Sequence, residues 1–433
     1  MSFFKPDTQR SFYKWEILIF LWIAFFLNQA DRQIFNVLLT SIQSDMHLSD
    51  TQMGLIATIF NFAFAVLVPV SGLLGDRMSK RNILVFSILL WSIATSMTGL
   101  SHTMWMFILF RSLATGMGEA AFGPAYISTL ADYHKETRAL AMSIHQTSYY
   151  FGVIASSMIA TYIGGLFGWR IAFVVFGAVG VLHGILMFIR MRDAPKHRAE
   201  CASAKPAEKR DSDGAKPPSL LDSLSIIFRV PTAVIVVVSF SGLIFVLTGY
   251  LTWMPAYLET EIGMTKTAAG FNAVFYTHIA AFVGVVLAGR MSDIVARINP
   301  ANRILMQSVG LLVAVPFIVM MGSASAEILI FVGLAGFGFA RAFFDANTYP
   351  VLYDVIPAKY RSSASGIMLM VGFGFGSLAA VILGHLKPIL GLSLGISLLA
   401  AVWVPCSLLL FIGYKFTYRR DFARREAVDA ASQ

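Results

Sequence analysis

Charged residues are scarce in this 433-residue sequence: Asp, Glu, Lys and Arg together make up 13% of it, against about a quarter in soluble proteins. The two cysteines, Cys201 and Cys406, lie far apart, so we expect neither a disulfide framework nor a cysteine-held metal. No Walker motif, zinc-ligand pattern or catalytic triad occurs in the sequence. These absences argue against an enzyme, a metal site and a bound cofactor.

Apolar residues, by contrast, are abundant: hydrophobic types make up 57% of the chain, and its mean hydropathy is +0.70. Apolar runs of roughly 18 or more residues recur along the whole length, which is typical of helical proteins that cross the membrane many times. The alternating segments of a transmembrane barrel are absent. Residues 1–16 lack a cleavable signal pattern, so the first apolar run is expected to be retained.

We predict an all-α membrane protein with twelve transmembrane helices in two pseudo-symmetric halves of six. The expected spans are 15–40, 52–75, 82–101, 104–132, 138–166, 170–191, 232–258, 267–289, 303–323, 327–355, 362–386 and 392–414. The N-terminal half covers 1–191, and the C-terminal half with its tail covers 223–433. Between them, 192–222 has the Lys-, Arg-, Ala-, Pro- and Ser-rich composition of a linker.

The basic residues predict the orientation. On the expected topology, 27 of the 33 Lys and Arg residues fall in the termini, the linker and the loops of one side. The opposite side holds only Arg170, Lys266 and Lys387. Because cytoplasmic loops collect Lys and Arg, both termini and the linker are expected in the cytoplasm. The same rule accounts for the net charge of +9 without nucleic acid as a partner.

One polar stretch interrupts the first apolar run. It contains Asn28, Asp31, Arg32 and Asn36, and ionised side chains in mid-membrane cost roughly 2.5–3.5 kcal/mol each on insertion scales. At 100° per residue, Asn28, Arg32 and Asn36 share one helix face, with Asp31 at its edge. Such residues usually line a protein interior or a water-filled cavity.

Two motifs are repeated between the halves, as in many secondary transporters. Gly72-Leu-Leu-Gly-Asp-Arg77 follows the second span, and Gly289-Arg-Met-Ser-Asp293 follows the eighth. The set Pro124, Asp132 and Arg138 has its counterpart in Pro350, Asp354 and Arg361.

The segment Gly72–Arg81, GLLGDRMSKR, resembles the signature loop of the major facilitator superfamily, with Ser79 where Gly is usual. Together with the repeats, the resemblance covers the whole chain. Four further segments resemble both the anion:cation symporter branch, which carries sugar acids and other organic anions with protons, and the spinster-like branch, which is associated with lysolipids and sphingoid lipids. They are Asp31-Arg32, Leu48–Gly54, Gly118–Ala120 and Gly168–Arg170.

Asp31 and Glu119 are the candidates for proton coupling. Burial disfavours the charged form of Asp31 and its neighbour Arg32 favours it, so a balanced site can change protonation. For Glu119 the role is implied by the resemblance. The alternatives are a permanent bond from Asp31 to Arg32 or Asn28, and a permanently protonated Glu119.

Arg32 is the candidate anion ligand, because its guanidinium fork matches a carboxylate and stays charged. The alternative is simple neutralisation of Asp31. In the two branches an Arg usually precedes the Glu of the fourth span by seven residues, whereas Arg111 precedes Glu119 by eight. Either the helix bulges at Thr115–Gly116, or Arg111 faces another way.

The remaining predicted substrate ligands are polar or aromatic residues at or within the spans. They are Asn28, Asn36, Tyr126, His145, Gln146, Tyr149, Tyr250, Arg341, Asp345 and Asn347. For the aromatic and histidine residues the alternative is helix packing. Arg341 and Asp345, spaced i,i+4, could equally form a structural ion pair.

A last group is predicted to control the conformational change. The resemblance implies that Gly72, Asp76, Arg77, Lys80 and Arg81 hold contacts between helices that break on switching, and the weak second copy adds Asp293. The alternative is that the cations only set the topology.

The sequence thus predicts a secondary transporter of the inner membrane, if bacterial, acting as a monomer. It would bring in a small organic anion, such as a sugar acid, together with H⁺, by alternating access. One alternative is a spinster-like lipid carrier. Another is a non-transporting membrane sensor, for which the chain offers no output domain.

Overall fold

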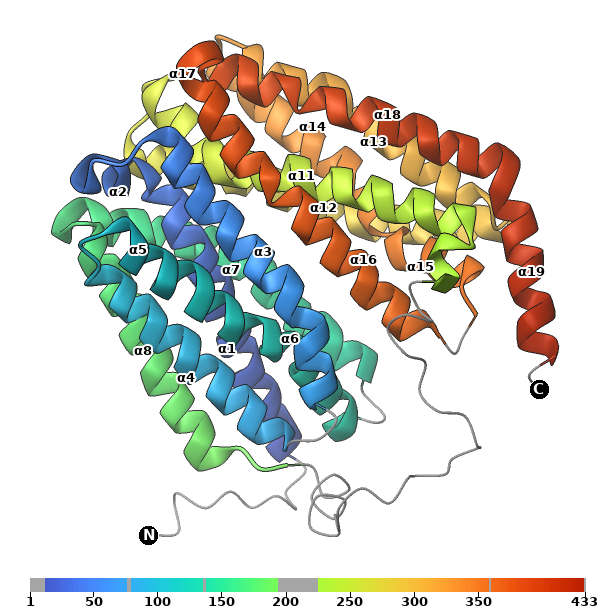
Figure 1. Ribbon diagram of the computed structural model, residues 1–433, viewed down its shortest axis with the longest axis horizontal. Coiled ribbons are helices and arrows are strands. Elements are labelled where there is room, and N and C mark those ends of the chain that lie inside the picture. Colours follow the sequence, from blue (N-terminus) through green and yellow to red (C-terminus); the bar gives the residue numbers. More distant parts are fainter. Residues whose placement is uncertain (1–11, 76–78, 135–137, 194–224, 358–359, 432–433) are drawn as a thin grey trace. The chain divides into compact units, whose positions relative to one another are not determined.

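The computed structural model describes residues 12–75, 79–134, 138–193, 225–357 and 360–431. Within these ranges every regular element is a helix (Figure 1). The contacts divide the chain into two compact units, one made of Met1–Ser49 and Ile59–Ala215 and the other of Asp50–Thr58 and Lys216–Gln433. The predicted linker, 192–222, lies outside the described residues except for Arg192 and Asp193.

The first unit is built from helices that run up to Arg190. They are α1 (Tyr13–Val37), α2 (Leu39–Met46), α3 (Asp50–Gly75, whose first nine residues belong to the second unit), α4 (Lys80–Gly99), α5 (Met104–Phe107), η2 (Ile108–Ala114, a π-helix), α6 (Thr115–Tyr133), α7 (Arg138–Phe167) and α8 (Trp169–Arg190).

The second unit contains the remaining helices. They are α11 (Pro231–Thr260), α12 (Lys266–Ile298), α13 (Asn302–Ser323), α14 (Glu327–Asp345), α15 (Thr348–Val355), α16 (Arg361–Gly376), α17 (Leu378–Leu398), α18 (Ala400–Ile412), η4 (Gly413–Thr417, a π-helix) and α19 (Tyr418–Ala431).

Ten helical stretches among the described residues are long and apolar enough to cross a membrane. The predicted fourth span is not among them, although residues 104–133 are helical without interruption. The predicted eleventh and twelfth spans fall in one stretch, Ser363–Ala430, which Gly391 interrupts with φ +73°. Glycine adopts this left-handed conformation at little cost. The count of twelve spans and the side on which the termini lie stay predictions.

The core of the first unit is centred on α1. Ile17, Leu21 and Ala24 are buried at the three- and four-residue spacing of a helix face. They belong to one apolar cluster with Trp91 of α4 and Phe122 of α6, whose rings meet edge to face at 5.2 Å between centroids. This packing fixes α1 against α6, the two helices that carry Asp31, Arg32 and Glu119.

A glycine allows α6 to approach α4 closely. A Cβ at Gly118 would lie 3.0 Å from the carbonyl oxygen of Ser87 and from the backbone nitrogen of Trp91, closer than side chains normally pack. Any larger residue would push the two helices apart. Glu119, the next residue, is therefore held at a defined depth beside α1.

The second unit packs α12 and α13 along α14, and α11 along α16. Trp403 of α18 stacks on Phe337 of α14 with 5.3 Å between ring centroids. Its Nε1 donates a hydrogen bond to the carbonyl of Gly242 on α11, 3.2 Å away. The buried indole N–H is thus satisfied inside the helix bundle.

Candidate functional site

Arg32 and Glu119 join α1 to α6 through an ion pair. Nε of Arg32 donates to Oε2 of Glu119 at 2.7 Å. The Glu119 side chain is fully buried, whereas the Arg32 side chain is 23% exposed. The guanidinium is the part of this pair that a dissolved anion can reach, and an arginine can hold a carboxylate with two parallel hydrogen bonds.

Two more charged groups complete a buried quartet with this pair. Asp31 and Arg111 are each only 4% exposed, and both interact electrostatically with Glu119. Thr95 of α4 lies beside Asp31. We call Asp31, Arg32, Arg111 and Glu119 the charged quartet. It carries no net charge when both acids are ionised.

Arg111 reaches the quartet because the helix that carries it changes type. It lies in the π-helix Ile108–Ala114, which ends just before Thr115. There the backbone N–H of Thr115 reaches the carbonyl of Phe110, five residues back. A π-turn absorbs one extra residue, so the eight-residue spacing from Arg111 to Glu119 brings both side chains to one site. The helix bulges, as the first alternative expected, over the residues that lead up to Thr115.

Aromatic rings cover the two arginines of the quartet. The Arg32 guanidinium carbon lies 4.6 Å from the ring centre of Phe64 and 5.3 Å from that of Phe60. The Arg111 guanidinium lies 4.2 Å from Phe60 and 5.3 Å from Phe35. Nε and Nη1 of Arg111 are buried and have no hydrogen-bond partner among the residues the structure describes. The cation–π contacts partly offset the cost of burying these two nitrogen atoms, because such contacts are stronger where water is excluded.

Asn28 and Asn36 flank the quartet on α1. The Asn28 side chain is buried, accepts a hydrogen bond from Gln29 at 2.9 Å, and lies beside Glu119. Asn36 lies one turn beyond Arg32 and is partly exposed. Their predicted role as substrate ligands is compatible with these positions and stays a prediction.

Histidine and tyrosine form an aromatic stack near α1 in the first unit. His145 of α7 stacks on Tyr126 of α6 at 4.3 Å and on Phe25 of α1 at 5.0 Å. Its Nε2 is buried without a partner in the described part of the chain. Tyr149 is partly buried, and Gln146 is exposed. All four predicted ligands, Tyr126, His145, Gln146 and Tyr149, thus lie on α6 and α7.

The second unit holds a smaller polar group. Nε of Arg341 lies 3.0 Å from Oδ2 of Asp345 one turn later on α14, and 30% of the Asp345 side chain is exposed. His278 of α12 is fully buried, interacts electrostatically with Arg341, and donates from Nδ1 to the carbonyl of Val274 at 2.8 Å. An ion pair within one helix braces that helix, and Asp345 is the partner that solvent reaches.

Asn347 and Tyr250, two further predicted ligands, are engaged inside the second unit. Asn347 accepts a hydrogen bond from Ser292 at 2.5 Å and donates to the carbonyl of Phe343 at 2.9 Å. Tyr250 is buried, with its hydroxyl bonded to the carbonyl of Ala273. Both arrangements favour a structural role, and substrate contact by either residue stays a prediction.

The predicted gating residues that the structure describes make contacts within one unit. Lys80 binds Asp132 at 2.7 Å. Arg81 donates from Nε to the carbonyl of Met191 at 2.7 Å and from its backbone to Asp193 at 3.0 Å. Gly72 lies in α3, and Asp76 and Arg77 lie outside the described residues.

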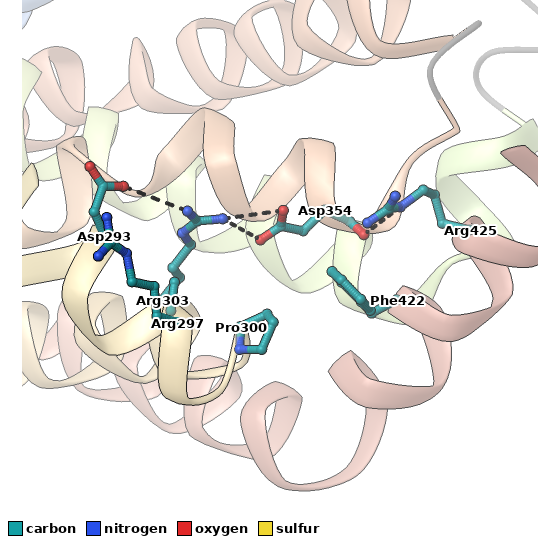
Figure 2. A pocket seen from close by; sticks show the side chains of 8 residues that line it. Asp293, Arg297, Pro300, Arg303, Asp354, Phe422 and Arg425 are labelled. Carbon is teal, nitrogen blue, oxygen red and sulfur yellow. Dashed lines mark hydrogen bonds and ion pairs between the residues drawn. The ribbon is translucent and has the colours of Figure 1, made fainter.

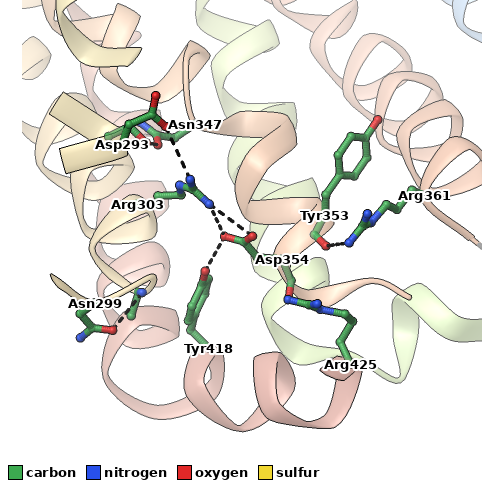
Figure 3. A network of polar contacts seen from close by, with 11 residues as sticks. Asp293, Asn299, Arg303, Asn347, Tyr353, Asp354, Arg361, Tyr418 and Arg425 are labelled. Carbon is green, nitrogen blue, oxygen red and sulfur yellow. Dashed lines mark hydrogen bonds and ion pairs between the residues drawn. The ribbon is translucent and has the colours of Figure 1, made fainter. Parts of the chain in front are cut away.

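Asp293, the last predicted gating residue, belongs to the second unit. Its Oδ1 lies 3.7 Å from Arg303 (Figure 3). Arg303, at the start of α13, also pairs with Asp354 at 3.2 Å. This cation–acid pair corresponds to Lys80 and Asp132 in the first unit.

A family model matches residues 21–381 and is described as the Major Facilitator Superfamily. The chain belongs to this superfamily. It therefore has the all-helical fold of major facilitator transporters and is a multi-pass membrane transporter rather than an enzyme. Among the residues described, no three His, Cys, Asp or Glu side chains are gathered as round a metal ion.

Individual major facilitator proteins resemble the chain over most of its length. A protein named hexuronate transporter from Bacillus subtilis is 25% identical over 92% of this chain and 94% of its own length. Protein spinster homolog 1 from Mus musculus is 28% identical over 83% of this chain and 70% of its own. Both branches recognised in the sequence motifs are thus represented among the relatives.

Among solved structures, the fold is similar to that of a bacterial homologue of the human lysosomal transporter spinster in an inward-facing, unoccupied conformation. The TM-score is 0.79, at 20% identity, over 97% of this chain and 99% of the other. At this identity the likeness concerns the fold alone.

Several residues of the site were not found by sequence reasoning. Phe60 and Phe64 are one turn apart on α3, and that spacing was the available signal, but it is common in any apolar helix. Thr95 is one of several hydroxyl residues on α4 and carries no distinguishing pattern. The place of Arg111 could not be decided, because a π-turn leaves no clear mark in the sequence.

Proposed function

We propose that the protein is a proton-coupled symporter of a small organic anion, and that the charged quartet is where proton and anion meet. The observation that carries the proposal is the pairing of a partly exposed Arg32 with a fully buried Glu119. The same guanidinium is the best anion ligand in this site and the partner of the acid.

Competition for Arg32 couples the two ligands. While Glu119 is ionised it occupies Nε of Arg32, and the quartet is neutral. When Glu119 takes up a proton, its bond to Arg32 weakens and the quartet gains one positive charge. An anion then binds the free guanidinium fork and restores neutrality. Charge balance therefore favours one proton for each carboxylate that is carried.

Arg111 and Asp31 determine the electrostatic potential at the place where proton and anion exchange. Arg111 stays positive and keeps the site attractive for an anion, while Asp31, beside Thr95, limits the positive charge when the site is empty. The rings of Phe60 and Phe64 over Arg32 exclude water and strengthen its electrostatic contacts. The substrate class that fits is a small carboxylate with polar groups, such as a sugar acid.

The transport cycle follows the general scheme for transporters built of two repeats. The anion and the proton bind from outside, the protein switches to its inward-open state, and both ligands leave into the cytoplasm. A relative named as a hexuronate transporter supports this substrate class. The likeness to spinster proteins supports a second candidate, in which a lysolipid with an anionic head group occupies the same arginine.

Uptake into proteoliposomes tests the proposal. The purified protein is given labelled glucuronate, galactonate or a lysophospholipid, with and without an inward proton gradient. We expect the gradient to drive accumulation of a sugar acid. Uptake that ignores the gradient would refute coupling, and lysolipid movement without sugar-acid uptake would decide for the second candidate.

A further inference from the structure

A cluster of arginines lies at one end of the second unit. A cavity of about 380 Å³, open to solvent on one side, is lined by the end of α12, the start of α13, the end of α15 and the C-terminal helix α19 (Figure 2). Its polar walls are Asp293, Arg297, Arg303, Asp354 and Arg425, and Phe422 closes one side. Three arginines and two aspartates line the cavity, and a third acid, Asp429, lies 3.7 Å from Arg425 outside the lining.

The acid deepest in this cluster already has its partners. Asp354 accepts from Nη1 of Arg303 at 3.2 and 3.4 Å and from the hydroxyl of Tyr418 at 2.6 Å (Figure 3). The other acid, Asp293, is held loosely: its side chain is 76% exposed and lies 3.7 Å from Arg303. Ion pairs this exposed contribute little, so an incoming anion can displace Asp293 into solvent.

Arg297 and Arg425, at the edge of the cavity, can each donate further hydrogen bonds to an anion. Arg297 is exposed and makes no ion pair or hydrogen bond with any residue that the structure describes. Arg425 lies over the Phe422 ring at 4.6 Å and donates from Nε to the carbonyl of Asp354 at 3.1 Å. Its contact to Asp429, at 3.7 Å, is long. Nε of Arg303 is buried without a partner in the described ranges.

The surroundings suit a lipid. Helix α12 has 33 residues, or about 50 Å at 1.5 Å per residue, which exceeds the ~30 Å hydrocarbon layer. The helix is therefore long enough for its last turns to reach the head-group region. Met291, Ile294 and Ile298 are 46%, 55% and 82% exposed there, at the spacing of one helix face, next to Arg297. Exposed apolar side chains beside a basic cavity fit acyl chains below a charged head group.

We propose that this cavity binds the phosphate of an anionic phospholipid. Arg297 and Arg425 hold the phosphate from two sides, and Arg303 joins them when Asp293 moves out. Guanidinium forks match phosphate oxygens with paired hydrogen bonds. The acyl chains lie along Met291 and Ile294, which precede Arg297 on α12. The site is independent of the transported substrate.

Lipid binding to the full-length protein in a neutral detergent tests the proposal. Native mass spectrometry counts bound short-chain phosphatidylglycerol and phosphatidylcholine, and thermal unfolding is followed with the same lipids and with inorganic phosphate. We expect phosphatidylglycerol to bind and stabilise the protein, and Arg297→Gln to bind it about tenfold more weakly, as for loss of one charged hydrogen bond. Because Arg297 is exposed, the variant should fold.

Arg424→Gln is the matched control. Arg424 is exposed on the same surface helix as Arg425 but does not line the cavity, so its loss changes the net charge equally and should leave binding as in the wild type. Equal weakening by the two variants would mean general attraction to a basic surface and would overturn the site. Equal affinity for phosphatidylcholine, or stabilisation by inorganic phosphate without any binding of phosphatidylglycerol, would overturn the lipid assignment.

Discussion

Deleting Leu113 from the π-helix should leave the transporter active. In a regular α-helix the eight residues from Arg111 to Glu119 would turn through about 800°, leaving their side chains about 80° apart. The π-turn removes this offset by absorbing one residue. Deleting Leu113, whose side chain is 41% exposed, shortens the spacing to seven residues. An α-helix then turns through about 700° and keeps both side chains within about 20°.

If the deletion instead moved Arg111 out of line with Glu119, the effect on stability would be large. An error of 80° displaces a Cα by about 3 Å on a helix of ~2.3 Å radius, and the long Arg111 side chain by more. A buried arginine taken away from Asp31 and Glu119 costs on the order of 3–5 kcal/mol. If the deletion keeps Arg111 in place, this cost does not arise. The free energy of unfolding should then stay within ~1–2 kcal/mol of wild type, and most proton-driven uptake in proteoliposomes should be retained.

Deleting Ile127 is the control. This residue is 46% exposed and lies in the α-helical part of α6, where no π-turn can absorb the change. Every residue beyond it rotates by about 100°, which separates Asp132 from Lys80, so we expect loss of folding or activity. If the Leu113 deletion folds but abolishes uptake as the Ile127 deletion does, the π-turn is not what aligns Arg111.

Three further predictions concern single side chains. Glu119→Gln should still exchange substrate across the membrane but lose accumulation under a proton gradient; retained accumulation in the uptake assay would contradict its role. Arg32→Lys keeps the charge but lacks the fork, so substrate affinity measured by calorimetry should fall about tenfold, and unchanged affinity would exclude Arg32 as the ligand. Burial lowers the pKa of His134 from 6.5, although its bond to the carbonyl of Lys14 opposes the shift. The stability that neutral His134 contributes is present above pH 6.5 and is lost as the pH falls through the folded-state pKa. His134→Gln should therefore lose less in unfolding temperature than the wild type between pH 8 and pH 5, and an equal loss would contradict this linkage.

The helices were predictable because their signals are long. A run of some twenty apolar residues leaves few alternatives to a helix in lipid, and α1, α4, α8 and α13 begin and end close to the predicted spans. The predicted eleventh and twelfth spans fall in one helical stretch, Ser363–Ala430. Gly391 interrupts that stretch with a positive φ in the gap predicted between the two spans, and the count of twelve stays a prediction.

The site was predictable only in part. Asp31, Arg32 and Glu119 stand out because charges are rare in these spans, and the resemblance pointed to Glu119. The ion pair between Arg32 and Glu119, 87 residues apart, depends on how α1 packs on α6, which single-helix periodicity does not contain. Asn347 shows a second difficulty: a polar residue in a span can bind a neighbouring helix, as it does in accepting a hydrogen bond from Ser292, and the sequence does not distinguish that role from substrate contact.

The two units have similar ion pairs at the ends of their helices but different ion pairs in mid-helix. This difference argues that the proton acts on the first unit. Each unit joins a cation at the start of one helix to an acid at the end of another, Lys80 to Asp132 and Arg303 to Asp354. In mid-helix, by contrast, Arg341 and Asp345 lie on the same helix, so breaking their pair would free no helix from its neighbour. The Arg32–Glu119 pair links α1 to α6, and protonating Glu119 removes a bond between two helices. A proton can change the packing of the first unit in this way, and for that reason the transport cycle should depend on Glu119 rather than on Asp345.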